Sequence, residues 1–297
     1  MNVRRGWLLS LASALAVALS AFVSGAVSVL AEPAAQPQLA PQPSPTPGAY
    51  GLLLRGAEAE EFLRTGQVIK KKPIGKGVTN PYQLTLTDGT RTLKAVWKTI
   101  DVSKFGITQF DRGGFEVGFR DTYKFEIAAY ELDKLLGLEL VPPTVERQIG
   151  GENGSMQLWV ESATTEWDRR AKKVIPPDTE SWNRQIYNVR LLHQLTYDSD
   201  YTNISNVLSD PSFKVYAVDF SRAFRIHDKL LSEKDLTRFS RSALDRLRAL
   251  ERASLVERLG SWLTGPEIDG LLKRRDKILA VAERRVGEKG EAAVLFP

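Results

Sequence analysis

The segment from Asp198 to Ser221 constrains the fold of this 297-residue chain more than any other. Two short apolar runs, Val207-Leu208 and Phe213 to Val218, flank the turn-forming residues Ser209-Asp-Pro-Ser212. Apolar runs on either side of such a turn predict a β-hairpin. Acidic and amide side chains stand at its two open ends, so we expect a polar site there.

The polar residues of this hairpin are Asp200, Asn206 and Asp219, and Asp219 lies 13 residues after Asn206. Phosphoryl transfer needs a carboxylate that orients the attacking hydroxyl. It also needs an Asn and a second carboxylate that hold Mg²⁺ on the phosphates. The same residues also fit a surface hairpin with solvated side chains, so the rest of the chain must decide between the two interpretations.

Composition excludes several classes of protein. The chain has no cysteine, which excludes disulfides, thiolate metal sites and a cysteine nucleophile. It has two histidines, His193 and His227, so a multi-histidine zinc site is not expected, and the apolar neighbours of His193 at helical spacing predict a packing role. Without Arg4 and Arg5, 39 basic and 36 acidic residues remain, and such a thin surplus does not predict a nucleic-acid partner.

The first 31 residues have the pattern of a targeting segment. Arg4 and Arg5 precede 26 uncharged residues, 6–31, which predict a signal peptide or an N-terminal anchor. Residues 32–50 are rich in proline and predict a disordered linker. Both alternatives place the body of the protein outside the cytoplasm, in a secreted, periplasmic or secretory-lumen location, with membrane contact only through an uncleaved segment.

Residues 51–162 have mainly strand-like patterns and are expected to form an N-terminal lobe. We expect a short helix at 57–64 closed by Gly66, strands at 67–74, 82–87 and 91–99 with a tight turn at Asp88-Gly89, and extended segments at 141–145 and 155–160. Asp121 is expected to cap a longer helix that ends at Gly137.

Residues 163–297 are expected to form a helical C-terminal lobe around the hairpin. Apolar spacing predicts a helix over 182–195 and two or three helices over 233–286, one of them starting at Gly265-Pro266-Glu267. The fold class is therefore α+β with two lobes, a β-rich N-terminal lobe with one helix and a helical C-terminal lobe.

Three further features precede the hairpin in a fixed order. Gly75 and Gly77 form a flexible link between two strands, which can bring backbone N–H groups close to phosphates. Lys98 lies on the expected strand 91–99, and Glu126 lies on the following helix. Each feature alone has an ordinary structural explanation, but their joint order is informative.

That order, and two stretches of sequence, resemble the protein-kinase-like fold in its atypical branch: secretory-pathway casein kinases, HipA-type kinases and phosphatidylinositol 3-/4-kinases. Glu126-Ile-Ala-Ala-Tyr-Glu-Leu-Asp-Lys-Leu-Leu-Gly137, followed by Leu140-Val-Pro-Pro-Thr-Val145, is similar to the Glu-bearing helix and next strand of the secretory kinases. Asp219-Phe-Ser-Arg-Ala-Phe224 resembles their metal-binding aspartate motif.

The resemblance implies ATP with Mg²⁺ or Mn²⁺ as cofactors and assigns a role to each residue. Lys98 would contact the α/β-phosphates and pair with Glu126, while Asn206 and Asp219 would ligate the metal. Asp200 would orient the acceptor hydroxyl, and Gly75 and Gly77 would lie near the phosphates. Trp159 and Val160, within the hinge Leu158 to Glu161, would meet the adenine through their backbone.

The chain departs from the family in the segment that carries the catalytic aspartate. Relatives have a basic residue after the Asp and the Asn five positions on, whereas here Tyr201-Thr202 follows Asp200 and Asn206 is six positions on. Asp198 with Asn203 is the alternative register. The sequence thus predicts an exported kinase acting on a protein or small-molecule hydroxyl, or a pseudokinase that binds a ligand or partner protein.

Overall fold

The protein is described by a computed structural model that covers residues 50–75, 81–104, 106–109 and 115–297. The chain divides into two compact units, 1–44 and 45–297, and every described residue belongs to the second. The predictions for 1–31, for nearly all of 32–50 and for Gly77 lie outside these residues. Within the described ranges, no helix combines the length and apolarity needed to cross a bilayer.

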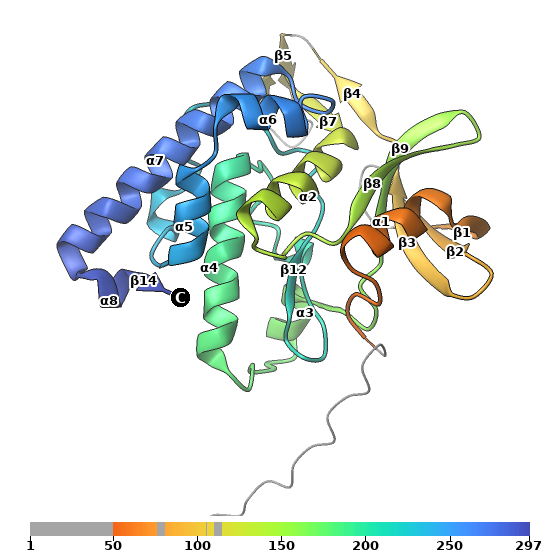
Figure 1. The fold of residues 1–297 in the computed structure, drawn as a ribbon, viewed down its shortest axis with the longest axis horizontal. Coiled ribbons are helices and arrows are strands. Elements are labelled where there is room, and N and C mark those ends of the chain that lie inside the picture. The colour runs from red at the N-terminus through yellow and green to blue at the C-terminus, as the bar shows by residue number, and fades with distance from the viewer. Residues whose placement is uncertain (1–49, 76–80, 105, 110–114) are drawn as a thin grey trace, which may run out of the picture. The chain divides into compact units, whose positions relative to one another are not determined.

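An antiparallel sheet of five strands forms the first half of the described chain (Figure 1). Its order is β1-β2-β3-β9-β8, with β1 (Gln67–Pro73), β2 (Tyr82–Thr87), β3 (Thr92–Lys98), β9 (Glu152–Leu158) and β8 (Thr144–Ile149). The turn between β2 and β3 contains Asp88 and Gly89 as predicted, and the Asp88 carboxylate accepts the N–H groups of Thr90 and Arg91. The edge strand β8 begins directly after Pro142-Pro143, where the lost N–H groups do no harm.

Two helices accompany this sheet. The short helix α1 (Gly56–Thr65) ends at Gly66 and contacts β8 and β9. The longer helix α2 (Lys124–Leu136) carries Glu126, and Gly137 ends it in the left-handed conformation at φ 60°. Gly137 thus terminates the helix as predicted, because glycine adopts this conformation without a steric penalty.

The prediction for the start of α2 was wrong. Asp121 does not cap the helix; it lies in strand β7 (Arg120–Thr122), and Tyr123 occupies the cap position without a side-chain cap. β7 pairs with β4 (Asp101–Ser103), and β5 (Ile107–Gln109) pairs with β6 (Phe115–Val117). The residues directly before α2 therefore pair as a strand, with Asp121 opposite Val102.

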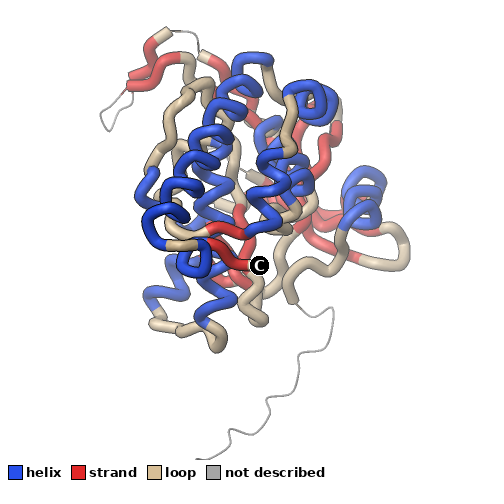
Figure 2. Tube along the Cα trace, turned by 60° about the vertical axis from the view of Figure 1, so that its left-hand side comes forward, coloured by secondary structure: helices blue, strands red, loops and turns tan. Residues whose placement is uncertain are grey.

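The second half of the chain, green to blue in Figure 1, is helical around a small sheet, and Figure 2 colours the helices blue and the strands red. The predicted hairpin is confirmed: β11 (Val207–Ser209) pairs antiparallel with β12 (Val215–Ala217), and β10 (Thr164–Thr165) joins them. The helices are α3 (Glu166–Ala171), α4 (Thr179–Thr196), α5 (Arg241–Arg248), α6 (Arg252–Leu259), α7 (Gly265–Lys289) and α8 (Glu291–Val294), with the short turns η1 (Ile204–Asn206) and η2 (Glu233–Asp235) and the paired strands β13 (Phe239–Ser240) and β14 (Leu295–Phe296). α7 starts with the predicted Pro in its first turn and a capping box from Thr264 and Glu267.

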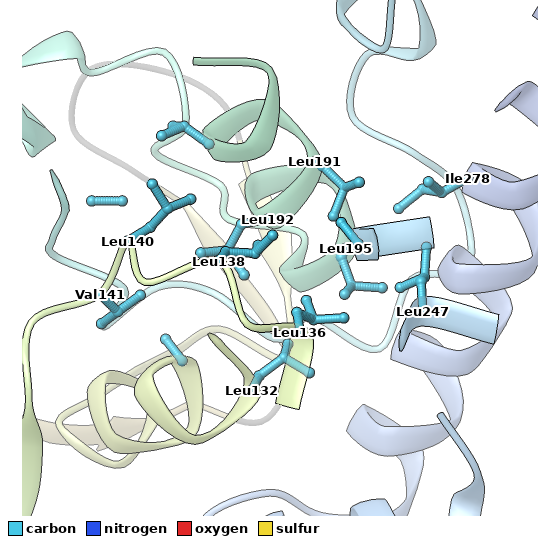
Figure 3. Packing of buried hydrophobic residues seen from close by; sticks show 14 of the residues in the cluster. Leu132, Leu136, Leu138, Leu140, Val141, Leu191, Leu192, Leu195, Leu247 and Ile278 are labelled. Carbon is cyan, nitrogen blue, oxygen red and sulfur yellow. The ribbon is translucent and has the colours of Figure 1, made fainter. Parts of the chain in front are cut away.

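Buried hydrophobic side chains of the described residues form two cores. One lies against the sheet and includes Phe62 of α1 with Leu84, Trp97 and Met156 of three strands. The larger core joins α2 to the helical half, and Figure 3 shows leucines of α2 and the loop after it beside Leu192 and Leu195 of α4. The helix that bears Glu126 is thus packed on the same core as α4, which leads into the Asp198–Asn206 segment. The α+β class, a sheet-rich first part and a helical second part, is confirmed.

Candidate functional site

A cleft of about 380 Å³ lies between the sheet and the hairpin. Its apolar walls come from both sides: Val96 and Leu158 from the sheet, Leu208 and Val218 from the hairpin. Its polar lining includes Lys98, Asn206 and Asp219. Apolar walls with a few convergent polar groups are typical of small-molecule sites.

The cation at the centre of this site is Lys98, the last residue of β3. Its Nζ lies 2.6 Å from Glu126 Oε1 and 2.7 Å from Asp219 Oδ1. The side chains of Lys98 and Glu126 are only 10% and 2% exposed, whereas that of Asp219 is 41% exposed. The predicted ion pair of Lys98 with Glu126 is present, and one end of the bridge opens to the cleft.

The pKa values of this trio follow from burial and mutual charge. Burial alone lowers the pKa of Lys98, but the charges of Glu126 and Asp219 outweigh it and raise that pKa. Burial raises the pKa of Glu126 despite Lys98, while the Lys98 charge lowers the pKa of Asp219. One cation between two carboxylates leaves a surplus of negative charge on the open side, at Asp219, where a metal cation is favoured.

The backbone around Asp219 aims its side chain at Lys98. Asp219 has φ 68°, in the left-handed region, which Asp tolerates better than most residues. The turn is held on both sides: Phe220 N–H donates to Glu126 Oε2 at 3.1 Å, and Thr122 N–H donates to Ser221 O at 2.9 Å. These two hydrogen bonds join the turn after β12 to α2, which carries Glu126, and to β7.

The aspartates at the other end of the site have different surroundings. Asp198 is fully buried; its Oδ2 lies 2.8 Å from His193 Nδ1, and its Oδ1 accepts the N–H of Asp200 at 3.0 Å. Asp200 is half-buried, and its Oδ2 accepts from the amides of Asn203 and Asn206 at 3.1 and 3.2 Å. Asp198 thus anchors the loop from inside, while Asp200 is held beside Asn206, which lines the cleft.

His193 contributes more than the helix packing predicted for it. It is buried on α4, pairs with Asp198, and its ring stacks on Phe220 with 5.6 Å between centroids. Since Phe220 follows Asp219, one imidazole contacts both the loop before Asp200 and the turn after Asp219. Sequence reasoning missed this link, as it missed the bond from Lys98 to Asp219, because both depend on how distant segments meet.

The remaining predicted residues have the following positions. Trp159 and Val160 line the cleft, and in the described part of the chain the Val160 N–H makes no hydrogen bond, so it can donate to a ligand. Gly75 has φ 69° just after β1, and its neighbour Ile74 lines the cleft. Gly77 lies outside the described residues.

A divalent cation with phosphate ligands fits the donors present. Among the described residues, no group of three or more His, Cys, Asp or Glu side chains stands ready to hold a metal alone. Mg²⁺ does not need one, because it is bound by one or two protein oxygens together with phosphates and water. Asp219 and Asn206, which both line the cleft, supply such oxygens.

No protein-family model matches this chain, and neither does any curated protein. Several solved structures match it in fold. Hydra Fam20 with sugar aligns with a TM-score of 0.61 at 16% identity, covering 84% of this chain and 95% of that one. The Golgi casein kinase aligns with a TM-score of 0.58 at 15% identity (83% and 79% covered), and its form with Mn/ADP bound with 0.55 at 15% (80% and 78%).

At these identities the likeness establishes the fold and leaves the chemistry open. The fold is an atypical kinase-like fold resembling that of secretory-pathway casein kinases, as the sequence predicted.

Proposed function

We propose that this protein is an exported atypical kinase that transfers the γ-phosphate of a nucleotide to a hydroxyl on a protein or small molecule. The observation that carries the proposal is the bridge of Lys98 to both Glu126 and Asp219 at the edge of the cleft. Catalysis of phosphoryl transfer consists mostly of positioning and charge neutralisation, and a lysine fixed by a buried glutamate supplies both.

The nucleotide would lie in the cleft with its base between the apolar walls. Val160 N–H would donate to the base, and Lys98 would contact the phosphates. Asp219 and Asn206 would hold Mg²⁺ or Mn²⁺, which neutralises the phosphate charge when bound. The Golgi casein kinase that shares this fold has been solved with Mn/ADP, which supports this choice of cofactors.

Asp200 is the better candidate for the carboxylate that orients the acceptor hydroxyl. Its carboxylate is held by Asn203 and Asn206 near the cleft, and it retains exposed surface. Asp198 has none, and both of its oxygens already have partners inside the protein. The register with Asp200 and Asn206 is therefore favoured over that with Asp198 and Asn203.

A location outside the cytoplasm is proposed from the sequence of residues 1–31. The neighbour named as a Golgi casein kinase supports it, because that protein works in the secretory pathway. The second candidate function is a pseudokinase that binds a nucleotide or partner without transfer. It is favoured by Tyr201-Thr202, which stands where relatives have a basic residue after the catalytic Asp.

Nucleotide binding is tested by thermal unfolding with ATP and Mg²⁺ or Mn²⁺. At one hundred times its dissociation constant, a ligand of the folded state adds about 2.7 kcal/mol of stability. We expect a metal-dependent rise in melting temperature that Asp219→Asn abolishes, because the carboxylate that balances the cation is gone. No rise with any nucleotide and metal would refute the kinase and leave the fold intact.

Transfer is tested by incorporation of γ-phosphate into the protein itself or into a hydroxyl-rich acceptor pool. Asp200→Ala is expected to abolish transfer while keeping the metal-dependent thermal shift. Asp198→Ala is compared at a temperature where it remains folded. Loss of transfer with Asp198→Ala alone would show that the register is wrong, and a thermal shift without transfer in the unmodified protein would favour the pseudokinase.

A further inference from the structure

Helix α3 and the loop after it, residues 166–175, form a surface that we call the α3 surface. It leaves large apolar side chains in water: Trp167 is 63% exposed, Ile175 79% and Val174 41%. Three such side chains within nine residues are unusual on a soluble domain, where isolated exposed apolar residues are the rule. An apolar surface of this kind indicates a partner.

The same surface is basic. Lys172 and Lys173 are exposed, and the side chain of Arg170 is 60% exposed. Two acids lie in the same stretch: Glu166 is buried and paired with Arg169 and Arg170, and Asp168 is exposed. Residues 166–175 therefore carry four basic and two acidic side chains. Exposed Trp and aliphatic side chains among lysines and arginines are the composition of segments that lie in the interface of a bilayer.

The described chain also begins in contact with the segment that leads into α3. Gly51 exchanges two backbone hydrogen bonds of 2.9 Å with Glu161, five residues before α3. Gly51 has φ 71°, and a Cβ there would lie 2.5 Å from Asp210 Oδ2, so this isolated bridge is tightly packed. Nineteen residues, 32–50, separate the uncharged run 6–31 from Gly51, and 19 residues span at most about 65 Å.

We propose that the α3 surface docks on a membrane with anionic headgroups, with Trp167 and Ile175 at the level of the headgroups and Lys172 and Lys173 on the lipid phosphates. The proposal goes beyond the proposed kinase function and does not depend on it. Each lysine close to an anionic surface strengthens binding about fivefold. A segment retained in the bilayer raises the effective concentration of the surface, so a weak contact is sufficient.

The test uses the full chain, which has no native cysteine. Ile175→Cys is labelled with an environment-sensitive fluorophore, and the protein is reconstituted into vesicles of phosphatidylcholine alone or mixed with phosphatidylglycerol. The matched control is Val256→Cys on α6, where Val256 is 42% exposed. Figure 1 shows α6 in the upper part of the view and α3 in the lower part. We expect brighter, blue-shifted emission from position 175 in the anionic vesicles and no change at position 256.

A second variant tests the role of charge. Replacing Lys172→Gln and Lys173→Gln together should shift the docking equilibrium about 25-fold toward the free state, because two lysine contacts are lost. Its melting temperature should not change, since both side chains are exposed. Emission at position 175 that is the same in both kinds of vesicle, or an equal response at position 256, would overturn the proposal. A signal that survives the double substitution would do the same.

Discussion

The two ends of the candidate site are built in different ways. At the end proposed to bind the phosphates, here the phosphate end, Lys98, Glu126 and Asp219 come from β3, α2 and the turn after β12, and the bond from Lys98 to Asp219 joins residues 121 positions apart. At the end proposed to bind the acceptor, here the acceptor end, Asp198, Asp200, Asn203 and Asn206 lie within nine residues of one loop. The first end depends on the whole fold, and the second on one loop whose residues differ in burial.

This difference determines what each end contributes to stability. Charges that are buried and come from separate elements must be paired, because an uncompensated buried charge is costly. Side chains of a surface loop can turn to water when a partner is lost. We therefore expect substitutions at the phosphate end to destabilise the fold, and substitutions at the acceptor end to do so only where the side chain points inward.

The largest expected effect is that of Lys98→Met. It removes the cation from Glu126, whose side chain is 2% exposed, and breaking such a buried pair costs about 3–5 kcal/mol. The control is Lys94→Met on the same face of β3, because Lys94 pairs with Glu161 while 43% exposed and should cost less than about 1 kcal/mol. Free energies of unfolding from urea titrations compare the two. If both substitutions lower the free energy of unfolding equally, the buried ion pair of Lys98 contributes no more to stability than the exposed pair of Lys94.

The next effect separates the two aspartates. Asp198→Ala leaves His193 Nδ1 and the Asp200 N–H without their partner inside the protein, at a cost of about 1–3 kcal/mol. Asp200→Ala removes a half-buried acceptor of two amides, of which the exposed Asn203 can turn to water and Asn206 lines the cleft, and should cost less than about 1 kcal/mol. Urea titration measures both. A larger loss with Asp200→Ala would contradict the inward role of Asp198.

The same contrast explains what the sequence could predict. The resemblance of the Glu126–Gly137 block to secretory kinases, with the order of Lys98, Glu126 and Asp219, predicted the fold and the ion pair, because a fold brings such elements together regardless of local detail. The sequence favoured Asp200 with Asn206 but left Asp198 with Asn203 as an alternative, since both register patterns are present. Which of the two carboxylates is buried against His193 on α4 depends on packing, and the spacing of residues does not reveal it.

A smaller effect concerns acid stability at the phosphate end. The charge of Lys98 lowers the pKa of Asp219, so this group stabilises the fold above its unfolded pKa, and the contribution is lost as the pH falls through the folded value. In Asp219→Asn that contribution is absent at every pH. The stability advantage of the unmodified protein should therefore be greatest above about pH 5 and shrink toward pH 2. With 41% of the side chain exposed, it should not exceed about 1 kcal/mol.

Urea titrations of both proteins between pH 2 and 6 measure this difference. The stability difference between the two should fall with decreasing pH, since protonation makes the carboxyl resemble the amide that replaces it. A difference that grows as the pH falls would mean that Asp219 is repelled by Glu126 more than it is attracted by Lys98.

The smallest expected effect on stability is that of Asn203→Ala at the acceptor end. The Asn203 side chain is exposed; its Oδ1 accepts the Ser205 N–H and its Nδ2 donates to Asp200. Loss of this exposed cap on the one-turn helix η1 should cost about 0.5 kcal/mol. The thermal shift with nucleotide and metal should survive, because Asp200 keeps its bond to Asn206, which lines the cleft.

Asn206→Ala is the matched variant and should lose that shift, since it removes one of the two proposed metal ligands. If Asn203→Ala loses the shift and Asn206→Ala keeps it, the metal is held in the other register, and the acceptor carboxylate must be reassigned even though Asp198 is buried.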